Sequence, residues 1–188
     1  MGPQLQPCGA GGASHGVLLL LRDIRQNPGP PKMINATETV KDIQAMRDNG
    51  FLSDAILRQA VKRIAAADDR YDWVGVYLLN PEGDELWLHN YVGDPTEHAR
   101  IAIGQGICGM AVERKSNMNV PDVTAVENYL ACSPHVQSEL VVLIRAGDDI
   151  FGQIDIDSEE AAAFTEADEA ALQLVADKLA EQIAAERR

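Results

Sequence analysis

The stretch ELVVLIRAGDDIFGQIDID, residues 139–157, consists of two apolar runs on either side of a short polar segment. Both runs are rich in Val and Ile, which favour extended strands, and the Gly-Asp-Asp segment between them is typical of a turn. We therefore predict a β-hairpin here. A second hairpin is predicted upstream, because residues 72–79 (DWVGVYLL) and 85–92 (ELWLHNYV) flank the turn sequence NPEGD.

Helical patterns precede and follow the hairpins. The first covers residues 37–47 and ends at an Asn-Gly pair, and the second begins after Ser53, whose hydroxyl can cap it. The last begins at Thr165, with Asp168 completing a capping box. Short strands are expected at residues 100–103 and 118–120 and a short helix at 110–114. This order predicts an α+β fold, in which terminal helices enclose an antiparallel sheet and long connections cross one face.

Composition limits the possible partners and the redox state. The net charge of -13 disfavours nucleic acid and anionic membranes as partners. No export signal is recognisable, so we expect a cytoplasmic protein with reduced cysteines. Residues 1–32 are rich in Gly and Pro, and we interpret them as a flexible extension that an upstream translation start or a cloning sequence would explain. Residues 33–188 then form the domain, with Met33 as the alternative start.

Alternating residues define one face of the first predicted strand. Trp73, Gly75 and Tyr77 are two residues apart, so their side chains share a face. Gly75 is then expected to leave a gap between two aromatic walls, which suits a small apolar or thioether group. Ordinary core packing is the alternative interpretation of this strand.

Three acids are predicted at one end of the sheet. Asp155 and Asp157 share one face of an otherwise apolar strand, and Glu139 opens the partner strand, near one or the other. Carboxylates this close repel one another, and partial burial raises the pKa of at least one of them. Such a group can bind an ammonium or donate a proton, although a solvated strand end is the alternative.

The three cysteines, Cys8, Cys108 and Cys132, form no CxxC pair and no metal-ligand spacing, so neither a structural disulfide nor zinc is expected. Cys108 is predicted in a Gly-rich loop just before a helix, whose N-terminus lowers the pKa of a thiol. Cys132 belongs to a long loop before the second hairpin. A single cysteine is usually inert, but two on pocket-forming loops indicate thiol redox chemistry. His98 and His135 lie on the same loops and are interpreted as surface or packing residues.

Taken together, the motifs WVGVY (at Trp73), GQGICG (at Gly104), YLACS (at Tyr129), SELVV (at Ser138) and GQIDIDS (at Gly152) resemble those of a GAF domain. More narrowly, they resemble the free methionine-R-sulfoxide reductases over residues 33–188. The resemblance implies a GAF fold, with a central antiparallel sheet of about five or six strands, terminal helices on one face and ligand-covering loops on the other.

The resemblance also implies roles for the cysteines. Cys132 corresponds to the cysteine that attacks the substrate, and Cys108 to the loop cysteine that can resolve the oxidised form. Many family members carry a further cysteine shortly before the Gly-rich loop, where this chain has residues 97–100 (EHAR). The oxidised cysteine is then resolved by Cys108 or by an external thiol, or it is not resolved at all.

Among the remaining positions, the resemblance assigns substrate binding and polarisation of the sulfoxide oxygen to Glu139, Asp155 and Asp157, and the aromatic lining to Trp73 and Tyr77. The expected activity is a thioredoxin-dependent L-methionine (R)-S-oxide reductase that repairs oxidative damage. It forms a sulfenic acid and then a disulfide, and it needs no metal or organic cofactor. The alternative is a non-catalytic GAF sensor, and a homodimer through the terminal helices is compatible with either.

Overall fold

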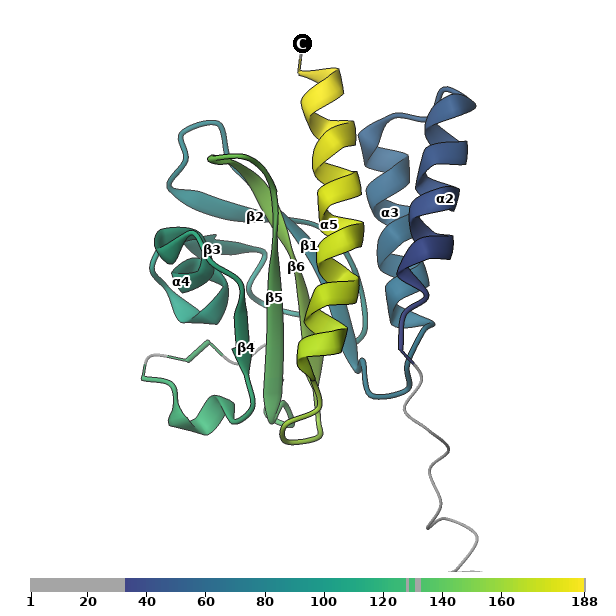
Figure 1. The fold of residues 1–188 in the computed structure, drawn as a ribbon. Coiled ribbons are helices and arrows are strands. Elements are labelled where there is room, and N and C mark those ends of the chain that lie inside the picture. Colours follow the sequence, from purple (N-terminus) through teal and green to yellow (C-terminus); the bar gives the residue numbers. More distant parts are fainter. Residues whose placement is uncertain (1–32, 128, 131–132, 188) are drawn as a thin grey trace, which may run out of the picture. The chain divides into compact units, whose positions relative to one another are not determined.

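The computed structural model describes residues 33–127, 129–130 and 133–187. Within them, six strands form one antiparallel sheet in the order β3-β2-β1-β6-β5-β4 (Figure 1). The strands are β1 (Trp73–Leu79), β2 (Glu85–Val92), β3 (Arg100–Ala102), β4 (Met118–Val120), β5 (Ser138–Ala146) and β6 (Asp149–Ser158). Both predicted hairpins are confirmed, and so is the antiparallel sheet.

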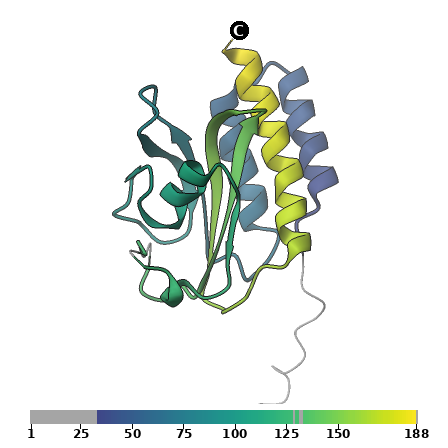
Figure 2. The ribbon, with the colours of Figure 1, turned by 60° about the vertical axis from the view of Figure 1, so that its left-hand side comes forward.

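Helices α2 (Ala36–Asp48), α3 (Ser53–Ala65) and α5 (Glu166–Glu186) lie on one side of the sheet. Helix α4 (Gly106–Arg114) lies on the other side, together with the connections around it (Figure 2). The strands supply both cores because successive side chains point to opposite faces. In β1, for example, Val74 packs with the three long helices, whereas Tyr77 packs with α4.

The helix ends follow local signals in two cases out of three. Thr165 and Asp168 form the predicted capping box at the start of α5. Helix α2 is followed by Gly50, with φ of 82°, a conformation that glycine adopts without strain. The capping role predicted for Ser53 is wrong. Ser53 is the first residue of α3, and its hydroxyl donates to the Glu186 carboxylate of α5 at 2.7 Å.

The connections contain a short 3-10 helix, η2 (Val123–Ala125), between β4 and β5. In the described part of the chain, no helix combines the length and the apolar character needed to cross a membrane. The boundary predicted between residues 32 and 33 coincides with the start of the described residues and stays a prediction.

Candidate active site

Strand pairing brings the three acids to one end of the sheet. In the β5–β6 ladder Glu139 lies directly opposite Asp157, which fixes the register that the sequence left open. In the β1–β6 ladder Gly75 lies opposite Asp155, and Trp73 lies opposite Asp157. Because β6 runs between β1 and β5, its two aspartates stand in the middle of the sheet.

All three acids are buried. Glu139 is 4% exposed, Asp155 is 1% exposed and Asp157 is fully covered. The alternative of a solvated strand end is therefore wrong. Such buried carboxyl groups need a positive partner, a hydrogen-bond donor or a proton, because an isolated charge is costly away from water.

Cys108 lies in the first turn of α4, not in the loop before it, because this helix begins four residues earlier than predicted. Two glycines set its position. Gly106 opens the helix with φ of 61°, and a Cβ at Gly109 would lie 2.4 Å from the Ala102 carbonyl oxygen of β3. The absence of a side chain at Gly109 therefore lets α4 approach the sheet closely.

The Cys108 thiol meets two of the acids. It is buried, and its Sγ donates to Glu139 Oε1 at 3.8 Å. One ligand atom each from Cys108, Glu139 and Asp155 can be chosen so that all lie within 4.8 Å of one another. A thiol and two carboxyl groups thus come together from α4, β5 and β6.

A small closed cavity of about 10 Å³ adjoins this cluster. It is lined by the cluster itself and by neighbours that include His98, Ile107 and Leu130. Its volume corresponds to about one water molecule. No Lys or Arg is present among the described residues that line it, so neither of these permanently charged side chains balances the acids in the cavity.

Burial and mutual repulsion change the protonation of the acids. Burial raises the pKa of Glu139 well above its usual range, and the charges of Asp155 and Asp157 raise it further. Burial likewise raises the pKa of Asp155 to about 7, although the nearby Cys108 and Glu139 partly oppose this. Neither carboxyl oxygen of Asp155 has a hydrogen-bond partner of normal geometry among the described residues. The cluster can therefore hold a proton near neutral pH.

The aromatic pair shares a face of the sheet with the acids, but it does not frame the gap that was predicted at Gly75. A Cβ on Gly75 would lie 2.2 Å from the Trp73 ring, so the indole itself fills the space above this glycine. Trp73 stacks on Tyr91 with ring centroids 5.5 Å apart. The Tyr77 hydroxyl donates to the His98 carbonyl at 3.0 Å. Neither Trp73 nor Tyr77 lines the closed cavity, so their contact with a ligand stays a prediction.

Sequence reasoning missed Gln153. This side chain is fully buried and lies two residues before Asp155, opposite Tyr77 in β1 and Leu143 in β5. Neither atom of its amide group has a hydrogen-bond partner among the described residues. The period of two that identified the aspartates also indicates Gln153.

The remaining predicted residues divide into two groups. Cys132, the predicted nucleophile, lies outside the described residues, as does Cys8. Asp157 is described and buried but does not line the closed cavity. His135 is exposed, in agreement with its interpretation as a surface residue.

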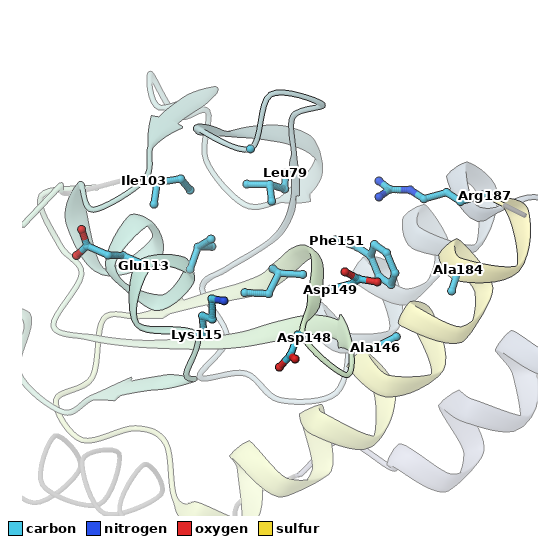
Figure 3. Close-up of a pocket in the computed structure, with 13 residues that line it drawn as sticks. Leu79, Ile103, Glu113, Lys115, Ala146, Asp148, Asp149, Phe151, Ala184 and Arg187 are labelled. Carbon is cyan, nitrogen blue, oxygen red and sulfur yellow. The ribbon is translucent and has the colours of Figure 1, made fainter.

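A much larger cleft, of about 960 Å³, opens at the other end of the sheet (Figure 3). Its charged side chains come from α4, from the β5–β6 turn and from the end of α5, and they stand around a wide opening. At the edge of this cleft, the guanidinium carbon of Arg187 lies 4.9 Å from the centre of the Phe151 ring. No cysteine belongs to the described lining of this cleft, whereas Cys108 lines the small cavity.

Comparison with known proteins agrees with this architecture. A sequence model of the GAF domain matches residues 52–183. The chain belongs to the GAF family. The free methionine-R-sulfoxide reductase of Escherichia coli is 39% identical over 106 residues, which are 56% of this chain and 62% of that protein. The chain spans 60–62% of the length of this relative and of one other.

Solved GAF structures extend the comparison to the whole fold. The free methionine-R-sulfoxide reductase from Neisseria meningitidis, solved with its substrate, has a TM-score of 0.73 at 31% identity, covering 81% of this chain and 90% of that one. A candidate GAF sensor protein from Burkholderia vietnamiensis has a TM-score of 0.71 at 27% identity, covering 78% and 92%. Because both kinds of protein share the GAF fold, the activity has to be argued from the site.

Proposed function

We propose that this GAF protein reduces free L-methionine (R)-sulfoxide to L-methionine with a cysteine thiol as the reductant. The observation that carries the proposal is the buried contact between the Cys108 thiol and the Glu139 and Asp155 carboxyl groups, in a cavity whose described lining contains no Lys or Arg. The similarity to reductases of this substrate supports it.

In the proposed complex with the substrate, the acids bind two different groups of the substrate. One carboxylic acid stays protonated and donates a hydrogen bond to the sulfoxide oxygen, which makes the sulfur electrophilic. The other carboxylates bind the free α-ammonium group, which peptide-bound methionine sulfoxide lacks. Burial raises the pKa of both Glu139 and Asp155, so either of them can be the proton donor, and the other then binds the ammonium.

The redox steps follow from the chemistry of sulfoxide and thiol. The Cys132 thiolate attacks the sulfur, the oxygen leaves the substrate, and methionine and a Cys132 sulfenic acid result. The Cys108 thiol then attacks this sulfenic acid, which forms a disulfide and releases water. A dithiol of the thioredoxin type reduces the disulfide, so the proposed cycle needs no metal and no organic cofactor.

The cavity has to widen for this chemistry, because about 10 Å³ does not admit an amino acid. Movement of Leu130 can widen the cavity, since its side chain packs against Gly106 at the N-terminus of α4. A Cβ on Gly106 would lie only 3.1 Å from that leucine. Substrate affinity would therefore include the cost of opening this contact.

A sensor without catalysis is the competing function, because a candidate GAF sensor has nearly the same TM-score as the reductases. The proposed homodimer through the terminal helices is compatible with either function. A groove between α2 and α5 exposes Leu174, which is 56% exposed, and would suit such a contact.

The decisive experiment incubates the reduced protein with the separated R and S epimers of free methionine sulfoxide and measures free methionine. We expect turnover of the R epimer with thioredoxin, thioredoxin reductase and NADPH, and none of a peptide-bound sulfoxide. Binding of the sulfoxide without formation of methionine would establish the sensor instead.

A further inference from the structure

The cluster of Cys108, Glu139 and Asp155 has the composition of a transition-metal site. Its three groups come from α4, β5 and β6, which is why the spacing of cysteines along the sequence gave no sign of it. One thiol and two carboxyl groups can supply three protein ligands, and the adjoining cavity has room for a water as the fourth. Three protein ligands and one open position is the arrangement of many tetrahedral zinc sites.

Distances within the cluster are close to those that zinc requires. Zinc–sulfur bonds of about 2.3 Å and zinc–oxygen bonds of about 2.0–2.2 Å, at tetrahedral angles, separate the sulfur from an oxygen by about 3.5 Å. Cys108 Sγ lies 3.8 Å from Glu139 Oε1. All three ligand atoms lie within 4.8 Å of one another, so side-chain movements of about 1 Å bring them to a common ion.

Asp155 provides an independent reason to expect a ligand. Its side chain is almost completely buried and lines the cavity, yet neither oxygen has a hydrogen-bond partner of normal geometry among the described residues. Buried polar groups in proteins are nearly always satisfied, so a buried carboxyl that faces a cavity with only the Cys108 thiol and the Glu139 carboxyl beside it points to a further partner. The described lining contains no Lys or Arg that could fill that role.

We propose that Cys108, Glu139 and Asp155 form a zinc site in the reduced protein. The thiolate excludes magnesium and calcium as preferred ions, because these bind oxygen ligands in shells of six or more. Zinc accepts mixed sulfur and oxygen ligands in a tetrahedral shell. The binding itself does not rest on the proposed reductase activity, because it requires neither substrate nor Cys132.

A consequence does rest on the proposed function. Zinc would engage the resolving thiol and two substrate-binding acids at once, so metal and sulfoxide would exclude each other. Zinc would then be a reversible inhibitor that holds the cluster in its reduced form until a chelator or another protein removes the ion.

The test uses the full 188-residue chain, reduced and freed of metal, with cobalt as a spectroscopic substitute for zinc. We expect one equivalent of cobalt to produce thiolate-to-metal charge-transfer absorption and zinc to displace it. Cys108→Ser should lose this absorption. Asp155→Asn, which keeps the side-chain shape, should retain it at saturation but weaken zinc binding at least about 10-fold in competition with a chromogenic chelator, since even outer-shell partners contribute 10–100-fold.

Matched controls separate this site from other thiols and acids. Cys8→Ser and the exposed Asp122→Asn should bind zinc as the parent does. Circular dichroism confirms the fold of each variant, and Asp155→Asn keeps the test decisive if Cys108→Ser does not fold. Unchanged zinc affinity in Asp155→Asn, or charge-transfer absorption that Cys132→Ser abolishes and Cys108→Ser retains, would overturn the proposal. Zinc binding in a protein that lacks reductase activity would refute the proposed function alone.

Discussion

Replacing Asp155 with Asn should stabilise the protein more strongly at pH 8 than at pH 5. The folded protein raises the pKa of this carboxyl from its ordinary 3.8 to about 7. A group with a raised pKa binds more protons in the folded state than in the unfolded state. The stability that it contributes is present below about pH 4 and is lost as the pH rises toward 7.

The size of the effect follows from the same two values. Each pH unit between them is worth about 1.4 kcal/mol, so the free energy of unfolding falls by up to about 4 kcal/mol across this range. Glu139 acts in the same direction, because its pKa is raised as well, and the two groups titrate as a pair. Asn cannot ionise, so Asp155→Asn should remove most of this decline and also relieve Glu139 of a neighbouring charge.

The assay is urea unfolding of the reduced protein at pH 5, 6, 7 and 8. The shift in the midpoint urea concentration gives the change in the free energy of unfolding when the slope of that free energy against urea stays constant. The difference between variant and parent should grow from about 1.5 kcal/mol at pH 5 to about 4 kcal/mol at pH 8. Asp148→Asn, which removes an exposed acid from the β5–β6 turn, is the control and should follow the parent. Parallel curves for parent and Asp155→Asn over the whole pH range would refute the buried, proton-holding carboxyl.

Other expected outcomes are more direct. Cys132→Ser should abolish turnover, whereas Cys108→Ser should form one equivalent of methionine, measured by mass spectrometry, and then stall with thioredoxin; wild-type rates in both would exclude the thiol mechanism. Single-turnover rates should be bell-shaped in pH, since the acid must be protonated and the thiol ionised, and a flat profile would contradict this. Removing residues 1–32 should leave activity and melting temperature unchanged, and a large loss of either would show that the segment contributes to the domain. Gly75→Ala should cost about 1–3 kcal/mol and alter tryptophan fluorescence, because the new methyl group overlaps the Trp73 ring; an unchanged spectrum would argue against that packing.

Local patterns in the sequence predicted the elements well, because most of these signals act within a few residues. The alternation in WVGVY places the aromatic residues on one face of their strand, and that in GQIDIDS places the aspartates on one face of theirs; the β1–β6 ladder confirms both and brings the two sets to the same face of the sheet. The Thr165 capping box is likewise complete within four residues. Such features need no information from the rest of the chain.

Predictions were wrong where a distant residue changes the local outcome. Ser53 would suit a helix cap, but Glu186, 133 residues away, takes both its hydroxyl and its backbone N–H. Gly106 indicates a loop, yet α4 begins there and carries Cys108 into its first turn. The predicted gap over Gly75 is filled because the Trp73 indole lies over this glycine of the same strand. Leu130, which lines the cavity, likewise lies against Gly106, a contact that no local pattern encodes.

The buried acids connect stability, chemistry and metal binding through one physical property. Glu139 and Asp155 line a cavity whose described lining contains no Lys or Arg, so a proton, a substrate ammonium or a zinc ion can supply the positive charge. Exchanging buried ionic groups for well-packed apolar residues is often neutral or stabilising by about 1–4 kcal/mol. Packing therefore gives no reason for two carboxyl groups beside a thiol at this position. A positively charged ligand does give a reason for them. When that ligand is absent, one of the carboxyl groups holds a proton near neutral pH, and this proton can be donated to a sulfoxide oxygen.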